Sequence, residues 1–105
     1  MKKIMFNIRT YEGKLEQQQG YAFYLEGLRF AIRKRIANVC QWTVTELTSG
    51  AVFYEGNEGE TRKACIQSTK DRLEKYGLAE CKRIIAAYIA KHAKPDTGEA
   101  NKCEN

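Results

Sequence analysis

The segment WTVTELTSGAVFYEGNEG, residues 42–59, predicts a β-hairpin that leads into a helix. Its first part alternates between the two faces of a strand, residues 48–50 supply a turn, and residues 51–55 are rich in β-branched and aromatic side chains. The glycine-rich residues 56–59 end the second strand. The hydroxyl of Thr61 can then accept a hydrogen bond from a free amide in the first turn of a helix.

Two helices are expected after this hairpin. The first covers about Thr61 to Tyr76, and Gly77 stands where a helix needs a left-handed terminating residue. The second covers Leu78 to His92, because apolar residues recur there at helical spacing. With one glycine between them, the two helices either pack as a tight hairpin or meet at a sharp kink.

The N-terminal part of the chain predicts one strand and one long helix. Lys3 to Arg9 alternates as a strand does. A helix is expected to begin within residues 15–21 and to continue to about Cys40, although Gly20 and Gly27 each weaken it by about 1 kcal/mol relative to alanine. Its apolar residues at helical spacing are Tyr21, Leu25, Leu28, Ile32, Ile36 and Val39.

These elements predict an α+β fold of order β-α-β-β-α-α, in which a small antiparallel sheet packs on helices. At 105 residues the chain has the size of one domain. We assign residues 1–94 to that domain and residues 95–105 to a flexible polar tail, because the apolar pattern stops after Lys94-Pro95.

Charge and cysteine content limit the kinds of partner and the cellular compartment that we expect for this protein. The chain has 18 basic and 13 acidic residues, a net charge of +5, which favours nucleic acid or an acidic protein surface as a partner. It has no long apolar run and no signal-peptide pattern, so we expect a cytoplasmic protein that does not bind membranes. The four cysteines are expected to be reduced thiols.

The first candidate site lies on the predicted long helix. Phe23 and Phe30 fall opposite its apolar face, and Glu26, Arg33 and Lys34 lie beside them. The candidate consists of the two rings and the cations Arg29, Arg33 and Lys34. We call these five residues the basic-aromatic strip. If exposed, the strip can stack on a base or fill a partner's pocket while its cations engage negative charge. The alternative is that both sides of the helix are covered and the phenylalanines belong to the core.

Arg35 differs from the other cations of this region. It falls on the apolar side of the predicted helix, so it must extend to solvent or pair with an acid such as Glu46 or Glu55.

The second candidate site is the helix start GETRKA, residues 59–64, where Thr61, Arg62 and Lys63 suit a phosphate site. The alternative is that Thr61 only caps the helix. Residues 52–73 resemble the junction of a strand and a helix in double-stranded-RNA-binding domains, whose helix begins Ser-Lys-Lys-x-Ala. They are also similar to the corresponding junction of HicB-type antitoxins, with its G-x-T-x-x-E-A segment.

A further resemblance concerns the pattern W-x-V-x-E-x-x-[ST]-G, which spans Trp42 to Gly50. Short chains rich in lysine and glutamate with such a hairpin resemble accessory proteins of bacterial phages and mobile elements. Some of those proteins inhibit host defence, and anti-CRISPR proteins are among them. The resemblance implies a protein that binds a host protein.

Catalytic and metal-binding signals are weak. The sequence has no nucleophile motif and no phosphate-binding glycine loop, so we expect no enzyme, no catalytic residue and no cofactor. Cys65, Cys81 and His92 lack the two-residue spacing of structural zinc ligands, so we expect no metal.

The leading hypothesis is a non-catalytic basic protein that recognises nucleic acid, or a host protein that handles nucleic acid, through the basic-aromatic strip and the helix start. The alternative is a phage-encoded inhibitor that binds a host defence protein through shape and exposed aromatic side chains. Homodimerisation through Phe23 and Phe30 would also explain an exposed strip.

Overall fold

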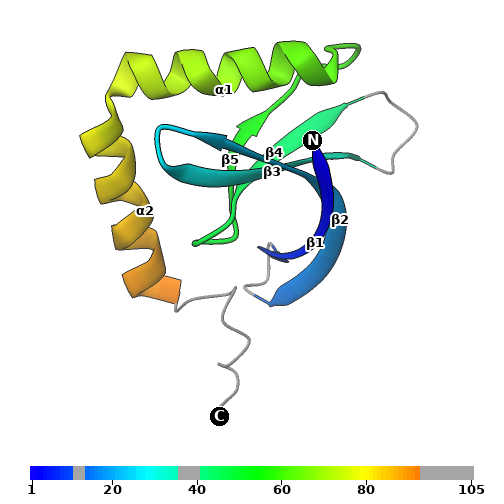
Figure 1. Ribbon diagram of the computed structural model, residues 1–105. Helices are drawn as coiled ribbons and strands as arrows, with labels where there is room; N and C mark the ends of the chain where they lie inside the picture. The colour runs from blue at the N-terminus through cyan, green and yellow to red at the C-terminus, as the bar shows by residue number, and fades with distance from the viewer. Residues whose placement is uncertain (11–13, 36–40, 93–105) are drawn as a thin grey trace.

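The computed structural model describes residues 1–10, 14–35 and 41–92. Those residues form five strands and two helices (Figure 1): β1 Lys2–Arg9, β2 Leu15–Leu25, β3 Leu28–Lys34, β4 Trp42–Glu46, β5 Ala51–Glu55, α1 Arg62–Tyr76 and α2 Leu78–His92. The α+β class is confirmed. The order β-α-β-β-α-α is wrong, because strands occupy the place of the first predicted helix. The predicted tail, residues 95–105, lies outside the described residues, as do Ile36, Val39, Cys40 and Cys103.

The five strands form one antiparallel sheet in which each strand pairs with the next along the chain, in the order β1-β2-β3-β4-β5. The sheet is strongly curled, and β1 and β2 bend round beneath β3 in Figure 1. The backbone N–H of Arg9 donates to the carbonyl of Gly50 at 3.0 Å, so the first and last strands approach each other at one end. One face of the sheet is therefore concave and the other carries α1.

The predicted helix of residues 15–40 is wrong. Its middle is a β-hairpin, in which Leu25 of β2 lies opposite Leu28 of β3 and two residues make the turn. Glu26 and Gly27 have positive φ angles of 52° and 80°, the conformation of a type I′ turn, whose twist matches the twist of the flanking strands. A helix would leave Phe23 and Phe30 on its polar side, whereas the hairpin places them opposite each other in the core.

The elements from residue 42 onward agree with the sequence. Strands β4 and β5 form the expected hairpin, and the Thr61 hydroxyl accepts from the Ala64 amide at 3.1 Å to cap α1. Gly77 ends α1 with φ 84°, and its amide donates to the Leu73 carbonyl at 2.8 Å. Of the two arrangements considered for the helices, the structure has the kink: α2 turns sharply away from α1 (Figure 1).

Two apolar clusters cover the two faces of the sheet. The larger lies between the sheet and the helices and consists of Phe23, Phe30, Ile32, Val44, Cys65, Leu73 and Cys81. The smaller lies on the concave face, where Phe6 of β1 packs with Ala31 and Leu47. Gly20 of β2 lies between β1 and β3. A Cβ atom there would stand 2.7 Å from the Ile32 carbonyl oxygen and 3.0 Å from the Phe6 ring, so only glycine fits without a shift.

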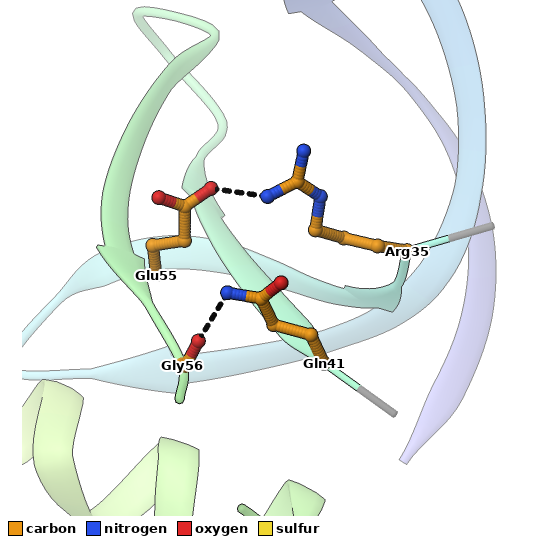
Figure 2. Close-up of polar contacts among 4 residues, drawn as sticks. All are labelled: Arg35, Gln41, Glu55 and Gly56. Atoms are coloured by element: carbon orange, nitrogen blue, oxygen red, sulfur yellow. Dashed lines mark hydrogen bonds and ion pairs between the residues drawn. The ribbon is translucent and has the colours of Figure 1, made fainter. Parts of the chain in front are cut away.

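Two side-chain contacts fasten the end of β5 to the residues that follow β3 and precede β4 (Figure 2). The Arg35 guanidinium pairs with the Glu55 carboxylate at 2.8 Å, and the Gln41 amide donates to the Gly56 carbonyl at 2.6 Å. The acid expected for Arg35 is therefore Glu55. Both side chains of the ion pair are about half exposed, so we expect it to stabilise the fold by less than about 1 kcal/mol.

Candidate nucleic-acid interface

The aromatic half of the basic-aromatic strip is buried. Phe23 is 8% exposed and Phe30 is fully buried, and their rings stack with centroids 5.3 Å apart. Phe30 also packs edge-on against Phe53, at 5.1 Å. The expectation of an exposed aromatic strip is wrong, because these rings hold the sheet against the helices. The alternative that placed them in the core is correct.

The cations of the strip fall on two faces of the sheet. Side chains alternate along a strand, so Lys34 shares the face of Phe30, while Arg29 and Arg33 share the concave face with Ala31. Burial lowers the pKa of the Arg33 guanidinium, and the charge of neighbouring Arg35 lowers it further. The structure therefore separates Lys34 from the two arginines with which the sequence grouped it.

A different group of cations and rings comes together on the helix-bearing face. Arg62, the first residue of α1, places its guanidinium carbon 4.8 Å from the centre of the Tyr21 ring and 5.9 Å from that of Trp42. Both distances are within the range of cation–π attraction. In the described part of the chain no carboxylate forms an ion pair with Arg62. Its contacts are with the two rings, and its charge stays available to a ligand.

Two lysines flank these rings on the sheet. In the strand register Lys3 of β1 lies opposite Tyr21, and Lys34 of β3 lies opposite Trp42. Directly opposed residues project from the same face, so both exposed amines border the rings. We call Lys3, Tyr21, Lys34, Trp42 and Arg62 the cationic-aromatic surface.

An open groove of about 430 Å³ continues this surface along α1. Arg62 and Lys63 line its helix side, and Phe23 and Tyr24 line its strand side. The first turn of α1 contains no acid, which suits an anion at a helix N-terminus. Thr61, expected as either a cap or a phosphate ligand, acts as the cap.

Glu60, the acid nearest to this helix start, is occupied by other partners. Its carboxylate accepts hydrogen bonds from the Asn57 amide at 2.9 Å, the Tyr54 hydroxyl at 3.0 Å and the Ser68 hydroxyl at 3.1 Å. The Asn57 bond is the largest cause of a lowered Glu60 pKa, and the two hydroxyls add to it against the opposing effect of burial. These bonds join β5 to α1 and so fix where Arg62 begins the helix.

The sequence identified Lys34, Thr61, Arg62 and Lys63 as candidates but missed Lys3, Tyr21 and Trp42. The predicted helix places Tyr21 on its apolar face, and this prediction does not bring Tyr21 close to Arg62. A hairpin reading of residues 15–34 would have placed it on the same sheet face as Lys34 and Trp42.

Within residues 1–10, 14–35 and 41–92, no three His, Cys, Asp or Glu side chains are grouped as a metal site requires. No helix in those residues has the length and apolar character needed to cross a membrane. Comparison with protein-family models, curated proteins and solved structures finds no match.

Proposed function

We propose that this protein is a non-catalytic nucleic-acid-binding domain that holds a single-stranded segment on the cationic-aromatic surface. The observation that carries the proposal is the position of Arg62 over the Tyr21 and Trp42 rings, without a carboxylate partner in the described residues. Single-stranded nucleic acids are bound by this combination of ring faces and basic groups, and each stacked base adds about 1–3 kcal/mol.

Each group has a distinct part in this proposal. Tyr21 and Trp42 are partly exposed and offer ring surface to unpaired bases, while Arg62 stacks and carries charge. Lys3 and Lys34 contact phosphates on either side of the rings, and Lys63 extends the path along the groove. A duplex offers no free base faces to the rings, so the proposal favours single strands.

In this proposal fewer residues of the basic-aromatic strip contact the ligand than the sequence predicts. Lys34 remains a binding residue, whereas Arg29 and Arg33 lie on the other face. The phage-type inhibitor hypothesis relied on shape and on exposed aromatic side chains, and the burial of Phe23 and Phe30 removes these two as anchors.

Fluorescence titration tests the proposal directly, because Trp42 is the single tryptophan of the chain. We expect 12-nucleotide strands of deoxythymidine or uridine to quench its emission, and a 12-base-pair duplex to bind more weakly. If Lys3, Lys34 and Arg62 each neutralise one phosphate, log affinity should fall with log salt at a slope of about −2.

Arg62→Ala is the decisive variant, and Arg72→Ala is its matched control. Arg72 also lies on α1 over two aromatic rings, those of Tyr54 and Tyr76, but away from this surface. Arg62→Ala should weaken binding at least about tenfold, as expected for loss of a charged hydrogen bond, and Arg72→Ala should change it little. Binding that leaves Trp42 emission unchanged, or equal losses in the two variants, would refute the proposal.

A further inference from the structure

A second concave site lies at the opposite end of α1, between β5 and α2. It is a cleft of about 340 Å³, within the range of small-molecule sites. Its apolar lining includes Val52, Phe53, Cys81, Ile84, Ile85 and Tyr88. Because α2 turns away from α1 (Figure 1), apolar side chains of α2 remain uncovered, and Ile84 is 51% exposed.

The available charge in this cleft is positive. Arg72 lines it and has its guanidinium carbon 5.6 Å from the centre of the Tyr54 ring and 6.0 Å from that of Tyr76. No carboxylate of the described residues forms an ion pair with Arg72. The rings hold the side chain while its charge stays free for a ligand.

Glu46, the one acid among the lining residues of the cleft, is buried and hydrogen-bonded within its own turn. It is 1% exposed, and its two oxygens accept from the Thr48 amide at 3.0 Å, the Thr48 hydroxyl at 2.5 Å and the Ser49 amide at 2.9 Å. Three donors therefore satisfy this carboxylate. A ligand anion would find Arg72 as its partner.

We propose that the cleft binds a small organic anion, a carboxylate with an aliphatic or aromatic body. The body would lie against the isoleucines of α2 and Phe53, and the carboxylate would pair with Arg72. An apolar cavity with one polar group that fixes orientation is the usual arrangement of a small-molecule site. The site is independent of the nucleic-acid surface, since Arg72 follows Arg62 by ten residues, about 15 Å along a helix.

Saturated carboxylates of increasing length test the proposal, with displacement of the fluorescent anion 1-anilinonaphthalene-8-sulfonate as readout. From hexanoate to octanoate, affinity should rise about fourfold per methylene, the equivalent of ~0.8 kcal/mol. Octylammonium, which has the same chain and the opposite charge, should bind at least about tenfold more weakly than octanoate. Backbone amide shifts on octanoate addition should include those of Phe53, Arg72 and Ile85.

Two variants separate the charge from the apolar wall. Arg72→Ala should weaken octanoate about tenfold without weakening octylammonium, while Arg62→Ala should leave both unchanged. Ile84→Glu should abolish octanoate binding, and because Ile84 is exposed the variant should still fold. Far-UV circular dichroism checks the fold of each variant.

The proposal is overturned if octanoate and octylammonium bind equally, or if the shifted amides lie around Trp42 instead. It is also overturned if sedimentation shows a dimer that Ile84→Glu dissociates, because a second copy would then cover the cleft.

Discussion

Replacing Gly20 or Gly27 with alanine should destabilise the protein, and the sign of the effect distinguishes the hairpin from a helix. In a helix either substitution would stabilise by up to about 1 kcal/mol, because alanine is the better helix former. In the hairpin the two glycines serve different purposes, so the two losses should have different physical causes.

At Gly20 the cost is steric. An added Cβ would lie 2.7 Å from the Ile32 carbonyl oxygen, 3.0 Å from the Phe6 ring and 3.2 Å from the Arg33 Cβ. The nearest of these is backbone in the central strand of the sheet, which cannot move without disturbing its pairing. Overpacking of this kind costs about 1–3 kcal/mol, against which the lower entropy of the unfolded alanine chain returns about 0.4–1 kcal/mol.

At Gly27 the cost is conformational. Nothing lies within 4 Å of the added Cβ, but the residue has φ 80°, which disfavours an L side chain by about 1–2 kcal/mol. The Gly27→Ala variant therefore shows strain without a clash and serves as the control for Gly20→Ala.

Urea unfolding followed by Trp42 fluorescence and far-UV circular dichroism measures both changes. We expect a net loss of roughly 1–2 kcal/mol for Gly20→Ala. For a domain of this size, each 1 kcal/mol lowers Tm by about 4–8 °C. An increase in stability for both alanine variants would mean that residues 20–27 are helical and would refute the hairpin.

Three further predictions concern single side chains. Glu26→Asn should raise the free energy of unfolding by about 0.5–1 kcal/mol, because Glu26 has φ 52° and Asn-Gly is the residue pair that type I′ turns prefer. An unchanged Tm would count against a type I′ turn at residues 26 and 27. The Glu60 pKa is lowered from its usual 4.5 by folding, so its stabilisation is complete above that pH and disappears as pH falls through the folded value. Melting curves from pH 7 to pH 3 should therefore show a smaller acid-induced loss for Glu60→Gln, and parallel curves would contradict this. Burial is the main cause that raises the pKa of the Cys65 thiol to about 11. Iodoacetamide at pH 8 should therefore label Cys65 only after unfolding, and peptide mass spectrometry measures this labelling. Labelling in the native protein would contradict the burial of Cys65.

The sequence predicts residues 42–92 well because local signals specify those elements. The two-strand pattern, the Thr61 cap and the terminating Gly77 each act within a few residues of the chain. Such signals need no knowledge of distant partners.

The β2–β3 hairpin has the sequence pattern of a helix because its apolar residues are symmetric about a turn. The pairs Tyr21 with Ile32 and Leu25 with Leu28 face each other across two strands, yet along the chain the same four residues are three or four apart. Helical spacing and hairpin symmetry therefore coincide here. The signal against the helix was Phe23 and Phe30, which a helix exposes and a hairpin pairs.

The candidate sites depend on contacts that local patterns do not predict. Arg62 was identified from its place at a helix start, but its contacts with Tyr21 and Trp42 join α1 to β2 and β4. The curl of the sheet and the start of α1 determine which rings lie beneath that guanidinium. Sequence spacing alone gives neither.

Arg62 and Arg72 show that the same local arrangement can serve two kinds of ligand. Each guanidinium lies over two aromatic rings, and in the described residues neither pairs with a carboxylate. What differs is the surroundings, since Arg62 lies on a sheet face with lysines and Arg72 lies beside an apolar cleft. An extended polyanion fits the first setting and a compact apolar anion fits the second. Because the two arginines are matched in chemistry, the loss that each alanine variant causes can be attributed to its site rather than to the lost charge alone.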